Sequence, residues 1–125
     1  MDAQTNIQFE PMPEQNNQIV TFNYEGTPIS FNRGDAVMVN ATEMAKPFGK
    51  RPVDWLNLPS TKEFITELSN VRKSNISDFQ PIITQQGSPV NGGGTWMHED
   101  VAIEFARWLS PKFAIWCNDR IKGVG

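Results

Sequence analysis

The stretch VNATEMAKPFGKRPVDWL, residues 39–56, contains two short helical patterns separated by a glycine. Asn40 is a favoured helix N-cap residue, and Glu43 follows it at the capping-box spacing. Gly49 suits the left-handed position beyond a first helix, and Pro52 suits the first position of a second one. The spacing therefore predicts a helix-turn-helix with a tight glycine turn.

Basic side chains surround this turn. In a helix-turn-helix, the N-terminal part of the second helix meets base edges in the major groove of DNA, while flanking basic and hydroxyl groups hold phosphates. We expect Lys50 and Arg51 at the entry to the groove, and Asn57 paired with adenine or a phosphate. The residues expected to hold the DNA backbone are Lys46, Thr61 and Lys62. A solvated face without a ligand is the alternative, since most charge runs have that role.

Alternating apolar residues before this stretch predict a β meander of three strands. The pattern begins at Gln18, turns at Glu25-Gly26 and again at residues 32–35, and ends with a short strand over residues 36–39. The helix-turn-helix therefore follows directly from a sheet.

A longer amphipathic helix is expected after the helical pair. Pro59 is expected to stop the second helix, and Ser60 with Glu63 has the spacing of another capping box. Apolar residues then recur at helical spacing up to about Lys73. We therefore predict a helix from Ser60 to about Lys73, followed by a polar link.

The next segment predicts a β-hairpin. Residues 79–84 have a strand pattern in which Pro81 indicates a sheet edge, and residues 95–97 form the partner strand. The loop QQGSPVNGGG, residues 85–94, is uncharged and rich in glycine, so its ends can turn freely and its backbone can approach a surface closely. We expect the hairpin to act as a wing whose tip lies in a neighbouring DNA groove or on its phosphates. The tip residues are Gln85, Gln86 and Ser88.

The only histidine of the chain lies beside two carboxylates, in the order His98, Glu99, Asp100. A zinc-protease helix needs a second histidine four positions on, where this chain has Ala102. Acidic residues are favoured in the first turn of any helix by the helix dipole. We therefore interpret His98 as the N-cap of a helix, with catalysis or metal binding as the alternative.

Apolar helical stripes predict two closing helices, the second starting at Ser110-Pro111. Three of the four tryptophans, Trp55, Trp108 and Trp116, fall within such helical stripes. We expect them to pack in the core rather than to serve as stacking platforms for single strands.

The composition suits one globular domain of 125 residues with a formal net charge of -3. Residues 1–31 hold four acidic side chains and no basic ones, so the remaining chain has 11 basic and 10 acidic side chains. A strongly basic nucleic-acid-binding composition is therefore absent, and any positive surface must come from clustering. The single cysteine, Cys117, excludes an intrachain disulfide.

Residues 1–17 are rich in Gln, Asn and Pro, and we expect a flexible acidic and polar tail there. The sequence contains neither a secretory signal nor a run of about 20 apolar residues that could span a membrane. We therefore expect a cytoplasmic protein.

Two blocks of the sequence resemble the signature of the KilA-N domain: residues 39–56, quoted above, and GGTWMHEDVAIEFARWLSPKFAIW at residues 93–116. The intervening STKEFITEL is similar to the usual middle of that domain, and the resemblance covers about residues 18–122. KilA-N domains occur in bacteriophages, large DNA viruses and integrated bacterial elements, and are similar to the fungal APSES transcription-factor domain. The resemblance implies a winged-helix-like DNA-binding module, usually followed by a variable second domain.

We therefore expect an α+β, winged-helix-like domain over residues 18–125, with a β meander, a helix-turn-helix, a hairpin wing and two closing helices. The expected function is non-enzymatic binding of double-stranded DNA by a phage-derived regulatory protein, without a metal or cofactor. A protein-protein interaction module without DNA binding is the alternative, because the domain is nearly neutral. A nuclease acting through His98 is a third hypothesis.

Overall fold

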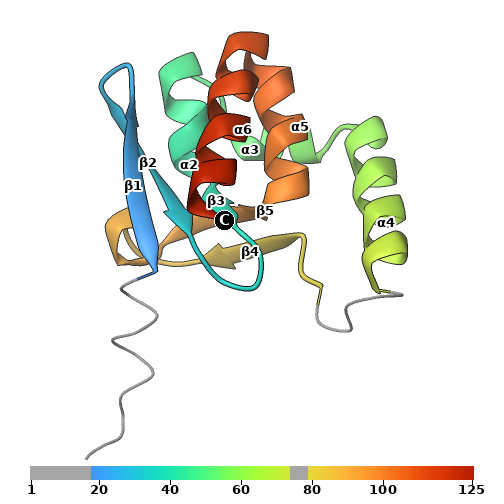
Figure 1. The fold of residues 1–125 in the computed structure, drawn as a ribbon. Coiled ribbons are helices and arrows are strands. Elements are labelled where there is room, and N and C mark those ends of the chain that lie inside the picture. The colour runs from blue at the N-terminus through green and yellow to red at the C-terminus, as the bar shows by residue number, and fades with distance from the viewer. Residues whose placement is uncertain (1–17, 74–78) are drawn as a thin grey trace, which may run out of the picture.

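The computed structural model describes residues 18–73 and 79–125. The predicted flexible tail over residues 1–17 and the predicted polar link over residues 74–78 lie outside this part of the chain. The described residues form a five-stranded antiparallel sheet with helices packed against one face, so the α+β class is confirmed (Figure 1).

The sheet has the strand order β1-β2-β3-β5-β4. Its strands are β1 (Ile19–Tyr24), β2 (Thr27–Asn32), β3 (Met38–Asn40), β4 (Ile82–Gln85) and β5 (Gly94–His98). The first three form the predicted meander, and β4 lies at an edge as Pro81 indicated. Both strands of the predicted hairpin belong to this sheet, since β4 pairs with β5 and β5 pairs with β3.

The third strand is shorter than predicted because Val37 bonds outside the sheet. Its N–H donates to the Glu99 carboxylate over 2.9 Å, and its carbonyl accepts from the Glu99 N–H over 2.9 Å. These two bonds tie the chain before β3 to the first residue of the helix that follows β5. The strand therefore starts at Met38.

The predicted helical pair is present, with two short helices. They are α2 (Ala41–Ala45), which continues into a 3-10 turn η2 (Lys46–Phe48), and α3 (Pro52–Leu56). Gly49 joins them at φ 63°, in the left-handed region that glycine enters without steric cost. The remaining helices are α4 (Pro59–Lys73), α5 (Glu99–Leu109) and α6 (Pro111–Val124), with a 3-10 turn η3 (Pro89–Asn91) in the hairpin loop.

Pro59 begins α4 rather than stopping α3, so the predicted capping box at Ser60 is wrong. Ser60 lies inside the helix, and the carbonyl of Leu58 accepts the first helical bond, from Lys62 N–H over 3.0 Å. Proline is favoured at a first helical position because its missing N–H has no partner there anyway. The same residue type marks helix ends and helix starts, and the sequence alone did not separate them.

Strand β3 ends early, so backbone N–H groups on its neighbours β2 and β5 lack acceptors from it. Side chains at the start of α2 accept from these groups instead. Continued by one residue, the strand registers place Ser30 of β2 opposite Asn40, the last residue of β3, and Thr95 of β5 opposite Ala41, the first residue of α2. The Glu43 carboxylate accepts from Ser30 N–H over 2.7 Å, and the Thr42 hydroxyl accepts from Thr95 N–H over 3.2 Å. Side chains of α2 thus continue both hydrogen-bond ladders.

Asn40 completes this arrangement, which we call the Asn40–Glu43 junction (residues 40–43). Its side-chain oxygen accepts from Glu43 N–H over 3.0 Å, which confirms the predicted N-cap. Its amide nitrogen donates to the Gly93 carbonyl over 2.9 Å and so holds the hairpin loop. Glu43 does not return the bond as a capping box would, because its carboxylate is used by Ser30.

The core lies between the sheet and helices α2, α5 and α6 (Figure 1). Tyr24 packs edge-on against Phe113 and Trp116 with ring centroids 4.7 and 5.1 Å apart, and Trp55 lies 5.3 Å from Phe105. Burial raises the pKa of the Cys117 thiol to about 12, so this thiol is an inert packing group. The tryptophans of the helical stripes therefore contribute to the core, as predicted.

We expect Glu43→Ala to lower the free energy of unfolding by about 2 to 3 kcal/mol, because it leaves the buried Ser30 N–H without an acceptor. Glu43→Gln keeps an oxygen there and should lose less. Urea denaturation measures both. Glu63→Ala, which removes an exposed carboxylate of α4, is the matched control with an expected change below about 0.5 kcal/mol. Wild-type stability of Glu43→Ala would contradict the role of the junction.

Candidate nucleic-acid interface

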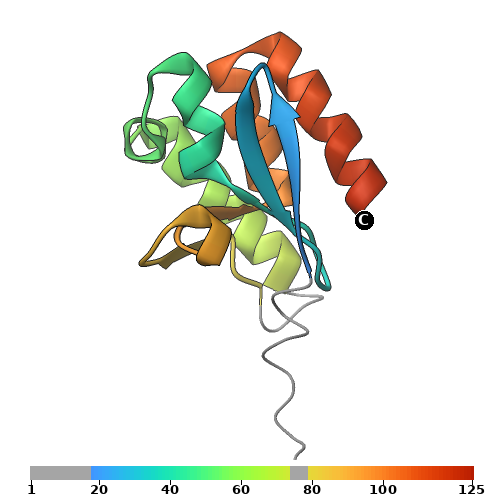
Figure 2. The same cartoon turned by 90° about the vertical axis from the view of Figure 1, so that its left-hand side faces the viewer.

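The turn between α2 and α3 exposes three cations on one side of the domain. Lys46, Lys50 and Arg51 are all solvent-exposed. Figure 2 shows this turn and the tip of the β4–β5 hairpin on the same side, with α6 on the opposite side. The Asn40–Glu43 junction connects the two features, since it begins α2 and bonds to the hairpin loop.

Lys50 is held by one aromatic side chain of α5. Its ammonium lies 4.4 Å from the ring centroid of Trp108, a cation–π distance. Trp108 in turn stacks on the buried Phe105 with ring centroids 6.0 Å apart. Such a contact contributes about 0.5 to 1 kcal/mol at an exposed site, so it restricts the lysine without removing its charge from solvent.

Arg51 is paired with Asp54 of α3 at 3.0 Å. Both side chains are exposed, at 74% and 49%, so the pair contributes little to stability. A phosphate could compete for the guanidinium at small cost. The carboxylate nevertheless offsets part of the positive charge at the turn.

The residues that the sequence predicted to contact the DNA backbone differ in their solvent exposure. Lys46 and Lys62 are exposed, and within residues 18–73 and 79–125 they have no acidic partner within 4 Å. Asn57 is exposed at the end of α3. Thr61 is 3% exposed, however, so its predicted contact with a phosphate is corrected: the residue packs inward at the start of α4.

Arg72 belongs to the basic run of α4 but serves a structural contact. Its guanidinium donates two bonds to one oxygen of Asp100, over 3.1 and 2.8 Å. This pair joins the end of α4 to the first turn of α5. Arg72 therefore adds no free positive charge to the interface.

The hairpin tip is exposed but folded on itself, which corrects the expectation that its ends turn freely. Gln85, Gln86 and Ser88 are exposed. The Ser88 carbonyl accepts from Gly93 N–H over 2.7 Å, and a Cβ added to Gly93 would overlap the Gly87 backbone. The glycines thus permit close chain packing, and the tip presents its amides from a closed loop.

His98, Glu99 and Asp100 are each used by the framework. The Nδ1 atom of His98 accepts from Asp100 N–H over 3.1 Å, so His98 caps α5 as predicted. Glu99 bonds to Val37 and Asp100 to Arg72. Within the described parts of the chain, no three His, Cys, Asp or Glu side chains gather as a metal site would require.

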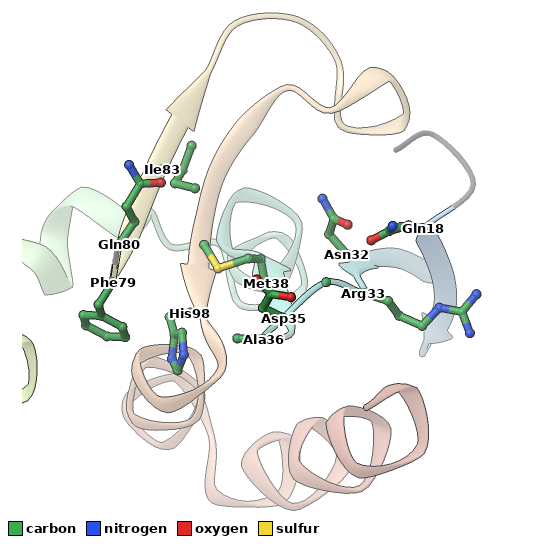
Figure 3. A pocket seen from close by; sticks show the side chains of 11 residues that line it. Gln18, Asn32, Arg33, Asp35, Ala36, Met38, Phe79, Gln80, Ile83 and His98 are labelled. Atoms are coloured by element: carbon green, nitrogen blue, oxygen red, sulfur yellow. The ribbon is translucent and has the colours of Figure 1, made fainter. Parts of the chain in front are cut away.

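A cavity of about 420 Å³ lies on the sheet face away from the helices (Figure 3). Met38 and Ile83 supply apolar walls, and Asn32, Gln80 and His98 supply polar ones. These side chains come from four separate segments, so no local sequence pattern predicted the cavity. Its lining among the described residues has a single histidine and no cluster of acids, and it lies on a different face from the α2–α3 turn.

The KilA-N domain family model matches residues 21–124, nearly all of the described chain. The chain belongs to the KilA-N domain family. The resemblance seen in the sequence is thereby confirmed. No helix of the described residues has the length and apolarity needed to cross a membrane.

Two known proteins are similar to this chain in amino-acid sequence. Protein kilA of Escherichia phage P1 is 35% identical over 95 residues, which cover 74% of this chain and 33% of kilA. The uncharacterized protein FPV248 of fowlpox virus is 26% identical over 102 residues, which cover 80% of this chain and 67% of FPV248. The chain thus spans about a third of the first relative and two thirds of the second. No solved structure matches the chain.

Two residues of this KilA-N surface were missed by the sequence reasoning. The helical pattern predicts Trp108 to be a core residue alone, yet its ring holds Lys50. Val53 of α3 was not singled out in the sequence, and it is 42% exposed. The exposure of Val53 had a signal: Val53 and Asn57 are four positions apart and face away from Trp55, which is buried.

We expect the domain to lose stability as the pH falls below about 6.5. Burial lowers the pKa of His98 from its usual 6.5, and the Asp100 and Glu99 carboxylates offset this only in part. The unfolded chain then binds a proton that the folded His98 resists. Stability is therefore present above pH 6.5 and is lost as the pH falls through the lower folded pKa.

His98→Asn separates this effect from the titration of carboxylates. Asparagine keeps an acceptor for the N-cap of α5 but does not titrate. Thermal unfolding between about pH 7.5 and pH 5 should therefore show a smaller loss of Tm in the variant than in the wild type. Parallel curves for the two proteins would contradict the assignment to His98.

Proposed function

We propose that this KilA-N domain binds double-stranded DNA without enzymatic activity, as a regulatory protein of phage type. The observation that carries the proposal is the exposed cationic turn at Lys46, Lys50 and Arg51 on the same side as the hairpin tip. A surface of this kind offers a helix for one groove of a duplex and a loop for the adjacent backbone. The similarity to protein kilA of a bacteriophage supports the phage connection.

In this proposal the two elements have different roles. The turn brings Lys50 and Arg51 to the edge of the major groove, with α3 directed at the bases and Lys46 and Lys62 at the phosphates. The hairpin tip contributes Gln85, Gln86 and Ser88 to the neighbouring groove or its phosphates. Because the tip has no charge, its contacts are short-range hydrogen bonds.

Because the proposed surface has few cations, we expect its affinity for DNA to depend only moderately on salt concentration. Each phosphate contact releases counterions and adds about one unit to the slope of log affinity against log salt. Four exposed cations, Lys46, Lys50, Arg51 and Lys62, set an upper limit of about four such contacts for the proposed surface. A large electrostatic contribution is therefore not expected from this domain.

A protein-interaction module is the second candidate, supported by two exposed features. Among the described residues, strand β4 is an edge of the sheet without a further partner strand, and another chain can add a strand to such an edge. Ile115 is 67% exposed on α6, a helix that lies on the side opposite the α2–α3 turn (Figure 2). In that case the domain would bind a partner protein and no duplex, even at low salt.

The test is fluorescence anisotropy with labelled duplex across about 50 to 200 mM salt. Lys50→Ala with Arg51→Ala should weaken binding and lower the salt slope by about one unit for each phosphate that the variant no longer binds. The matched control is Lys122→Ala, which removes an exposed charge from the far end of α6 and should leave both quantities unchanged. Wild-type affinity in the double variant would remove this turn from the interface.

A further inference from the structure

The outward face of α3 presents an aliphatic side chain and an amide side by side. Val53 and Asn57 are four residues apart, and the Asn57 N–H donates to the Val53 carbonyl over 3.0 Å. Both side chains lie opposite Trp55, which is 5% exposed and anchors the helix in the core. We call Val53 and Asn57 the reading face. Its orientation is fixed by a buried ring rather than by a flexible loop.

The neighbouring charges surround this face without covering it. Lys50 is held over Trp108, and Arg51 is paired with Asp54. These cations are suited to phosphates at the groove edges. Between them, Val53 leaves an apolar surface in solvent, which has no use in a phosphate contact. A duplex placed against these cations would bring base edges, rather than backbone, to the reading face.

We propose that the reading face recognises A·T base pairs in the major groove. The Asn57 amide would donate to N7 of adenine and accept from its N6 amino group, the two-bond pattern that amide side chains form with adenine. Val53 would pack against the 5-methyl group of thymine, the apolar group that the four standard bases expose in this groove. The proposal rests on duplex binding and adds the class of base that is read.

The spacing on the helix sets the spacing on the DNA. Side chains four residues apart have Cβ atoms about 5 to 6 Å apart. Successive bases of one strand rise by about 3.4 Å. Val53 and Asn57 therefore reach base pairs separated by one or two steps, so the adenine and the thymine methyl belong to neighbouring positions of one site.

The reading face holds neither of the groups that most often read G·C pairs. Guanine is most often read by an arginine with two donors, and cytosine by a carboxylate that accepts from N4. Arg51 and Asp54 lie beside the face and bind each other over 3.0 Å, in an exposed pair that a phosphate can open at small cost. The amide and aliphatic groups of the reading face have no such commitments among the described residues.

The experiment uses the full chain in two stages. A selection from random duplexes first defines the preferred site at low salt. In that site, each thymine is replaced by uracil, which removes only the methyl group, and each adenine by 7-deazaadenine, which removes only N7. For the wild type we expect uracil at one position to weaken binding about fourfold and 7-deazaadenine at a neighbouring position to weaken it about tenfold.

Variants assign these effects to the two side chains. Val53→Ala should lose the sensitivity to uracil and keep the sensitivity to 7-deazaadenine, while Asn57→Ala should show the reverse. Both residues are exposed, so neither substitution disturbs the core, and circular dichroism checks the fold. Ile115→Ala, which truncates an exposed aliphatic of α6, a helix on the opposite side of the domain, is the matched control and should keep both sensitivities.

The outcomes separate this inference from the proposed function. If the wild type binds no duplex at low salt, duplex binding and base reading both fail. If it binds duplex but selects no A·T pairs, or if the two variants keep wild-type sensitivity to both base changes, the inference is overturned while duplex binding stands.

Discussion

The hydrogen bonds of the Asn40–Glu43 junction hold the domain in one shape. Strand β3 has only three residues and lies between β2 and β5, so its early end exposes backbone groups on both neighbours. Buried N–H groups without acceptors are costly, and the Thr42 and Glu43 side chains accept from two of them. The same residues start α2. One short segment thus ends a strand, begins a helix and completes a sheet.

The junction also fixes where the hairpin loop can lie. The Asn40 amide bonds to Gly93, and a Cβ on Gly94 would come within 2.9 Å of that amide nitrogen. Gly94 has a φ of 110°, a conformation that other residues rarely adopt. The α2–α3 turn and the hairpin therefore share a rigid attachment. Their relative position is set by the buried hydrogen bonds of Asn40.

Local signals in the sequence predicted the caps, the glycine turn and the strands of the meander, because each depends on residues within four positions. Asn40 and His98 cap their helices as predicted, and Ser110 caps the helix that was predicted to start there. The pairing of β5 with β3 and the use of Glu43 by Ser30 depend on partners far along the chain, and neither was foreseen. The burial of Thr61 has the same cause, since only the packed fold decides which face of α4 turns inward.

The sequence predicted most residues of the candidate surface. The structure corrects how many of the nearby cations are free of acidic partners. Sequence counting treats every cation alike, but the fold assigns partners to several of them. Arg72 bonds to Asp100, Arg107 lies 3.6 Å from Glu104, and Lys112 lies 3.9 Å from Glu25. These pairs leave much of the domain electrically neutral. The α2–α3 turn keeps exposed lysines, so a chain of negative net charge still has a local positive field.

The α2–α3 turn has few unpaired cations, so long-range electrostatic attraction can contribute little to the choice of a ligand there. A surface with few free cations gains little from long-range attraction, which is in any case screened beyond about 8 to 10 Å at physiological salt. Its selectivity must then come from groups in direct contact, whose energies depend on shape and hydrogen-bond direction. In the proposed complex, Val53 and Asn57 would be such groups, held outward by Trp55 in the core. The proposed discrimination between ligands therefore depends on contact chemistry more than on charge.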